Sequence, residues 1–115
     1  MQKSLDASAR IQAELDREVE VIDLRSLVPW DRDLVADSVR RTGRLLVVHE
    51  DVVTCGFGAE VAAWAADDLY TDLRAPIRRV GAIDTHVAYE PTLEEVILPQ
   101  VGDIATAAAS LLAHP

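Results

Sequence analysis

The four consecutive apolar residues in "RLLVVHE", Leu45 to Val48, constrain the fold more than any other stretch of the chain. A strand that is covered on one face alternates apolar and polar residues, whereas a strand covered by helices on both faces is apolar throughout. The run begins just after Gly43, a typical helix stop, and ends before the turn-like "CGFG". We therefore expect a central strand in a sheet that lies between two layers of helices.

Helix-like and strand-like segments alternate along the rest of the chain. The expected strands lie over Val19–Leu24 and Ala75–Val80, in addition to the central one. The expected helices run from about Leu5 to Arg17, between Asp31 as N-cap and Gly43, and from Gly58 to Tyr70. A short helix capped by Thr92 follows, and the final helix has six residues inward: Val101, Ile104, Ala105, Ala108, Leu111 and Leu112. Helices between successive strands imply right-handed crossovers and parallel strands. The predicted fold class is α/β, with a mostly parallel sheet in a three-layer α/β/α arrangement.

Length and charge narrow the classes of function. With 115 residues, half of them hydrophobic and 27% charged, we expect residues 1–115 to form a single folded domain. A net charge of −9 disfavours binding to nucleic acid or to an anionic membrane, and it favours a basic protein partner. No apolar run approaches the roughly eighteen residues of a membrane span. Because the lone Cys55 can form no internal disulfide, we expect a cytoplasmic protein.

Polar side chains gather where two of the predicted strands end, which is the edge where open parallel sheets bind ligands. His49, Glu50 and Asp51 follow the central strand, and Asp84 and His86 follow the next one. These groups could converge on a metal ion, although their spacing is not diagnostic. The favoured interpretation is structural, because a histidine that leaves a buried strand commonly hydrogen-bonds to its neighbours and closes the loop.

Two other chemistries stay open for the loop that follows. A small Cys-His enzyme would use Cys55 as nucleophile and His49 as base, at the start of a helix that could lower the pKa of a thiol. A freestanding module would bind a small anion through free amides of the Gly56–Gly58 turn, although the full phosphate-binding pattern is absent. A glycine turn that packs a helix closely against a sheet explains the same residues.

Four motifs occur in order: "EVIDLR-L-P-D", "TGRL-VVHE", "GFGAE" and "AP--RV---DT--------E---LP". From about Ala9 to Leu112 the chain resembles the C-terminal domain of the β subunit of thiamine-diphosphate-dependent 2-oxoacid dehydrogenases. The resemblance implies a transketolase C-terminal-like fold and a non-catalytic assembly role in a branched-chain 2-oxoacid or pyruvate dehydrogenase first component. The residues that match the family's turn would be structural or interfacial: His49, Glu50, Gly56, Phe57, Gly58 and Glu60.

The same resemblance implies cofactors and partners for the assembled enzyme. Thiamine diphosphate and magnesium would lie between the α subunit and another domain of the β subunit, so this chain is expected to bind no cofactor and no metal and to be non-catalytic alone. The implied partners are the dehydrogenase α subunit, a second β subunit and the basic peripheral domain of the acyltransferase core. The net negative charge agrees with the last of these.

The chain departs from the family pattern in four places. The family domain normally opens with one more strand, of the "ITLVTYG" type, so we expect a sheet that lacks its first strand. The chain would then be a fragment of a longer β subunit, or a short product whose sheet edge is covered by a partner or a second copy. Arg74 stands where an acid commonly precedes "AP", Cys55 replaces a glycine, and His86 stands where proline is frequent.

Overall fold

Two parallel strands form the sheet of the computed structural model, which describes residues 1–115. Strand β1 (Leu46–Val52) pairs with β2 (Arg78–Ala82), with Leu46 opposite Arg78 and Val48 opposite Val80. The register shifts between Val48 and Val52, where the chain turns towards the loop after β1. The predicted central strand and its parallel neighbour are confirmed, although β2 begins three residues later than the expected Ala75.

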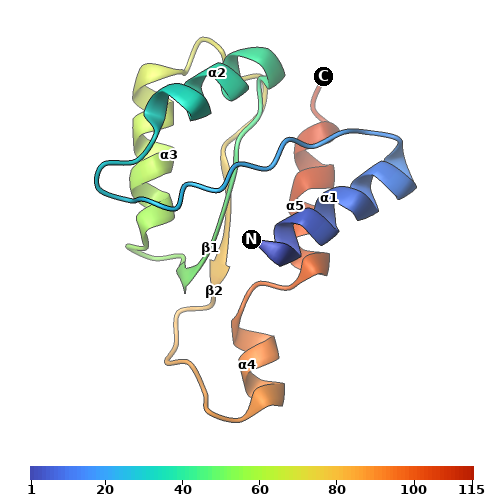
Figure 1. Ribbon diagram of the computed structural model, residues 1–115, viewed down its shortest axis with the longest axis vertical. Coiled ribbons are helices and arrows are strands. Elements are labelled where there is room, and N and C mark those ends of the chain that lie inside the picture. The colour runs from blue at the N-terminus through green and yellow to red at the C-terminus, as the bar shows by residue number, and fades with distance from the viewer.

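Helices cover both faces of this sheet, as Figure 1 shows. Helices α2 (Arg32–Thr42) and α3 (Phe57–Asp68) lie on one face, and α1 (Gln2–Leu15) and α5 (Val101–Leu112) lie on the other. The side chains of β1 divide between the two layers: Val47 packs against the α2–α3 core, and Leu46 and Val48 pack against the α1–α5 core. The continuous apolar run therefore has the predicted cause, and the three-layer α/β fold is confirmed.

Each helix layer has its own hydrophobic core. Ile11, which is 2% exposed, anchors α1 on α5 against Ile104 and Ala108. On the other face Val39 and Leu69, each 1% exposed, belong to the α2–α3 core. Full burial of a side chain of this size contributes about 1.5–3 kcal/mol relative to leaving it in water, so both layers are held to the sheet by ordinary core packing.

The best-marked helix of the sequence has the predicted ends. The Asp31 carboxylate accepts a hydrogen bond from the Leu34 N–H at 3.0 Å, and Gly43 ends α2 with a φ of +71°. The other helices shift by a few residues: α1 ends at Leu15, and α3 runs from Phe57 to Asp68. The short helix α4 (Pro91–Ile97) is capped by the Glu90 carboxylate and not by the predicted Thr92, which lies inside its first turn.

The predicted strand over Val19–Leu24 is wrong. The segment is extended, but its backbone is hydrogen-bonded to neither strand, so the sheet has two strands and not three. Its side chains nevertheless pack as those of a strand would, with Val19 against the α1–α5 core and Ile22 and Leu24 against the α2–α3 core. The alternation that suggested a strand therefore describes the packing of this segment but not its hydrogen bonds.

Length and composition alone would allow Pro91–Leu112 to cross a membrane. In the structure this stretch forms two helices, because Leu98, Pro99 and Gln100 are not helical. Four residues of α5 are buried in the core of the domain: Ile104, Ala105, Ala108 and Leu111. The stretch thus has the packing of a core helix preceded by the short helix α4, and the expectation of no membrane contact stays a prediction.

Candidate functional site

The sequence placed His49, Glu50 and Asp51 after the central strand, but all three lie within β1, which runs to Val52. The imidazole of His49 fills a space left by three glycines. A Cβ atom on Gly58 would lie 2.3 Å from His49 Nε2, and one on Gly81 would lie 2.9 Å from His49 Cε1. A Cβ on Gly56 would lie 2.0 Å from the Val52 carbonyl oxygen and 3.0 Å from the same ring carbon. The turn is therefore shaped around the ring, as the structural interpretation of the sequence predicts.

Hydrogen bonding engages one side of the same ring. His49 Nδ1 lies 3.0 Å from the carbonyl oxygen of Asp51, and this contact fits the tautomer that carries its proton on Nδ1. Nε2 is then an acceptor, and it is buried without a hydrogen-bond partner. An unpaired buried polar atom costs about 1–3 kcal/mol, so the ring is held by its packing and by one bond at the loop.

The geometry gives no support to a Cys-His enzyme. Cys55 is exposed, with a φ of +60°, and no hydrogen bond joins it to His49. The Nε2 atom that a base would present to the thiol is enclosed beside Gly58 instead. The His49 ring packs where side chains at Gly56 and Gly58 would lie, and the small-anion alternative for this turn stays a prediction.

The groups proposed as metal ligands do not converge. No cluster of three or more His, Cys, Asp or Glu side chains that could hold a metal ion is found in residues 1–115. Asp84 instead accepts hydrogen bonds from the hydroxyl and the N–H of Thr54, and these bonds, the hydroxyl's first, lower the pKa of its carboxyl below the ordinary 3.8. Asp84 thus ties the loop after β2 to the loop after β1.

The six predicted interface or turn residues differ in what they can offer a partner. Gly56 and Gly58 are buried and His49 and Phe57 are half-buried, whereas Glu50 and Glu60 are exposed. Phe57 and Glu60 line a surface hollow of about 770 Å³ whose other wall is formed by residues 27–33. Within this motif, Gly56 and Gly58 therefore form a buried packing turn, whereas Phe57 and Glu60 line a partly apolar hollow beside it.

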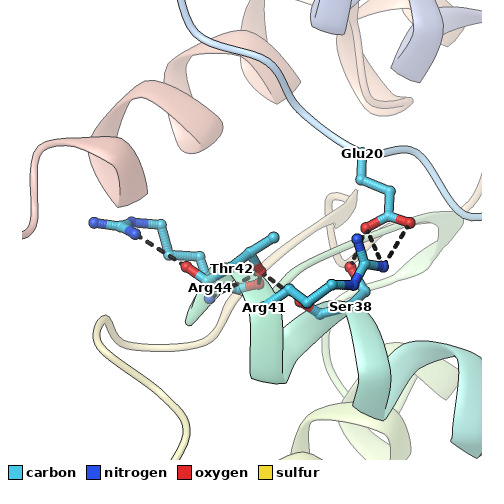
Figure 2. A network of polar contacts seen from close by, with 5 residues as sticks. All are labelled: Glu20, Ser38, Arg41, Thr42 and Arg44. Atoms are coloured by element: carbon cyan, nitrogen blue, oxygen red, sulfur yellow. Dashed lines mark hydrogen bonds and ion pairs between the residues drawn. The ribbon is translucent and has the colours of Figure 1, made fainter.

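A second network fixes the extended segment that precedes α2. Figure 2 shows the Glu20 carboxylate pointing towards Arg41 and Ser38, which lie on α2. Arg41 Nη2 donates to both Glu20 oxygens at 3.1 Å, and the Ser38 hydroxyl donates to one of them at 2.6 Å. These bonds, that of Ser38 first, lower the pKa of Glu20 below the ordinary 4.5.

Sequence reasoning missed one surface, the segment Ile83–Val96, which we call the arm. It projects from the body of the domain and includes most of α4 (Figure 1). Five large apolar side chains on it are more than half exposed: Ile83, Val87, Tyr89, Leu93 and Val96. The sequence signal was the accumulation of apolar residues in a segment predicted to be mostly loop. Apolar side chains of an exposed loop do not contribute to the hydrophobic core, so a group of them indicates a contact surface.

Comparison with known proteins identifies the family. Residues 1–104 match the family described as "Transketolase, C-terminal domain". The chain is 37% identical over 112 residues to the acetoin:2,6-dichlorophenolindophenol oxidoreductase subunit beta of Bacillus subtilis, which is 97% of this chain and 32% of the relative. It is 40% identical over 97 residues to the 3-methyl-2-oxobutanoate dehydrogenase subunit beta of Mycobacterium tuberculosis, 84% of this chain and 27% of the relative.

A plant relative extends the same pattern. The chain is 50% identical over 74 residues to the mitochondrial 2-oxoisovalerate dehydrogenase subunit beta 2 of Arabidopsis thaliana, 63% of this chain and 21% of the relative. This chain therefore spans about a fifth to a third of the length of these curated relatives. The resemblance stated from the sequence motifs is confirmed: the chain belongs to the transketolase C-terminal domain family, and its relatives are β subunits of 2-oxoacid and acetoin dehydrogenases.

Proposed function

We propose that this chain is a non-catalytic assembly domain of a 2-oxoacid dehydrogenase β subunit, of the branched-chain or pyruvate class. Relatives named as β subunits of 2-oxoisovalerate, 3-methyl-2-oxobutanoate and pyruvate dehydrogenases support the enzyme class. The arm supports the assembly role, because exposed apolar side chains that are grouped on one element are typical of a protein interface.

The arm presents exposed apolar side chains to a partner, next to the acidic Glu90, Glu94 and Glu95. Tyr89 is fully exposed and Val96 is 71% exposed, while Ile97 is the only buried residue of α4. Aromatic residues such as Tyr89 are enriched in the buried centre of interfaces. We assign the arm to contact with the α subunit or a second β subunit, and the acidic remainder of the surface to a basic partner such as the peripheral domain of an acyltransferase.

The residues of this chain do not fit a magnesium–diphosphate site. The chain has no cluster of three metal-ligating side chains that could hold the magnesium ion. Thiamine diphosphate and magnesium therefore belong, in this proposal, to other parts of the assembled enzyme. The chain contributes contacts between subunits, and it is expected to have no 2-oxoacid decarboxylase activity alone.

The test uses the β subunit that carries this domain, co-expressed with its α subunit. The double variant Tyr89→Ser with Val96→Ser should weaken assembly at least tenfold, as measured by analytical ultracentrifugation, because each apolar side chain buried at an interface contributes about 1.5–3 kcal/mol. Tyr70→Ser is the matched control, since Tyr70 is also 71% exposed but lies outside the arm. Unchanged assembly of the double variant, or an equal loss in the control, would contradict the proposal.

A further inference from the structure

The loop before α2 holds two exposed apolar side chains in a defined conformation. Val28 is 90% exposed and Leu27 is 51% exposed. The Ser26 hydroxyl donates a hydrogen bond to the Pro29 carbonyl at 2.6 Å, and Arg25 has a left-handed φ of +51°. A left-handed backbone is unfavourable for a residue with a side chain, and such strain is concentrated at functional sites. A strained loop that exposes neighbouring apolar side chains is therefore a candidate contact surface.

These two side chains belong to the wall of the surface hollow of about 770 Å³ between residues 27–33 and the first turn of α3. The nearly buried Trp30 and the half-buried Phe57 add aromatic surface to its lining. A small molecule inside the hollow would leave the outer side of Val28 in water, whereas a protein segment laid across the rim would cover it. The expected occupant is therefore a segment of another protein.

The rim of the hollow has an excess of negative charge. Its charged residues are Asp31, Asp33, Glu60 and Arg32. The Asp31 carboxylate is engaged by the Leu34 N–H as the cap of α2. Asp33 and Glu60 are exposed, and neither takes part in any ion pair of the chain. Both lie in the first turn of a helix, where an acid is favourable by itself, but their carboxylates remain free to pair with a cation.

The positive charge of Arg32 is held against aromatic rings. Its guanidinium carbon lies 5.4 Å from the centroid of the Trp30 ring and 5.8 Å from that of the Trp64 ring, within the range of a cation–π contact. The two rings meet edge to face with their centroids 4.8 Å apart, so they form one platform for the guanidinium. Arg32 forms no ion pair, and the carboxylates of Asp33 and Glu60 are left without a counter-charge.

We propose that the hollow is a docking site for a segment of another protein in which an apolar side chain stands next to a lysine or arginine. The apolar side chain packs against Leu27, Val28 and Phe57, and the cation pairs with the carboxylate of Asp33 or Glu60. An acidic segment is disfavoured because it would bring like charges together, and this includes the arm of a second copy, which has acids but no lysine or arginine. The proposal does not depend on the assembly role, because no residue of the arm lines the hollow.

The test titrates the nitrogen-15-labelled chain with the peptide acetyl-Ser-Lys-Leu-Lys-Leu-Ser-amide and follows backbone and indole N–H groups by NMR. The basic peptide should shift residues 27–33 and 57–60 and the indole of Trp30, whereas a control peptide with glutamate in place of lysine should not. The double variant Asp33→Asn with Glu60→Gln should weaken binding of the basic peptide at least threefold. Glu94→Gln with Glu95→Gln is the matched control, because it removes the same charge from exposed residues outside the hollow and should bind as the unchanged chain does.

The apolar contact has its own variant. Val28→Ser should also weaken binding of the basic peptide at least threefold, whereas Val87→Ser, which changes an exposed valine of the arm, should not. Circular dichroism checks that each variant is folded. If Val28→Ser does not fold, the comparison of the two charge variants decides the result.

Three results would overturn the proposal. The first is that the basic peptide causes no shifts at residues 27–33 and 57–60. The second is an equal loss of binding in the two charge variants, which would show attraction to the overall negative charge and not to the hollow. The third is concentration-dependent shifts of the same residues without any peptide, together with a dimer in ultracentrifugation, which would assign the hollow to a second copy of the chain.

Discussion

Replacement of Gly58 by alanine tests whether the glycine turn is built around the His49 ring. The new Cβ would lie 2.3 Å from His49 Nε2 and 2.5 Å from Cδ2, well inside van der Waals contact. The ring has little room to retreat, because Gly81 and Gly56 already allow it to pass within about 3 Å of the positions their own Cβ atoms would take. The substitution must therefore displace either α3 or the ring.

Gly102 supplies a matched control for this substitution. Gly58 and Gly102 are both the second residue of a helix, in α3 and α5, but a Cβ on Gly102 would meet no atom within 4 Å. Alanine is favoured over glycine in a helix by up to about 1 kcal/mol, so Gly102→Ala should stabilise the chain by about 0.5–1 kcal/mol. Overpacking costs typically 1–3 kcal/mol, so Gly58→Ala should destabilise the chain by about 1–2 kcal/mol after the helix gain is subtracted.

Urea unfolding followed by circular dichroism measures the free energy of unfolding of both variants. The thermal midpoint of Gly58→Ala should fall by about 4–8 °C. The contact with His49 is isolated by repeating Gly58→Ala in a His49→Ala background, where the methyl group should be tolerated. The two substitutions should then show a coupling energy of about 1–3 kcal/mol. The reasoning is refuted if Gly58→Ala is as stable as Gly102→Ala, or if its cost persists after the ring is removed.

Two further predictions concern the backbone and the carboxylates. Cys55 has a left-handed φ of +60°, so Cys55→Gly should raise the free energy of unfolding by about 0.5–1 kcal/mol, and a loss of stability would show that the thiol makes a necessary contact. The hydrogen bonds of Ser38 and Arg41 lower the folded-state pKa of Glu20 below its ordinary 4.5, so their contribution is complete above that value and is lost as pH falls through the lowered pKa. Acid titration of stability should therefore show a loss below about pH 4.5 that is smaller in Glu20→Gln, and identical pH profiles would argue against the network.

Local signals explain the parts of the fold that the sequence predicts well. The limits of α2 follow from a capping carboxylate at Asp31 and a glycine stop at Gly43, which act within a few residues of the helix. The prediction of Thr92 as the cap of α4 is wrong, because Thr is a more common cap than the Glu90 that takes this role. Pro91 in the first helical position was the overlooked signal, since its fixed φ favours that position.

Some contacts of the candidate site could not be predicted from the sequence. Gly56 and Gly58 lie in the same loop as His49, so a packing turn could be predicted from the sequence. Gly81 on β2 lies against a third side of the His49 ring. Asp84, which follows β2, accepts a hydrogen bond from Thr54 in the loop after β1. Both contacts depend on the pairing of two strands about thirty residues apart, which no local pattern specifies.

The segment Val19–Leu24 has one property of a strand, the alternating side-chain packing, but lacks the other, the ladder of backbone hydrogen bonds. Its alternation is a statement about side chains, and these pack half-buried against the two helix layers. A ladder also needs a neighbouring backbone within hydrogen-bonding distance, and no backbone hydrogen bond joins this segment to β1. Side-chain pattern can therefore be correct while strand assignment fails.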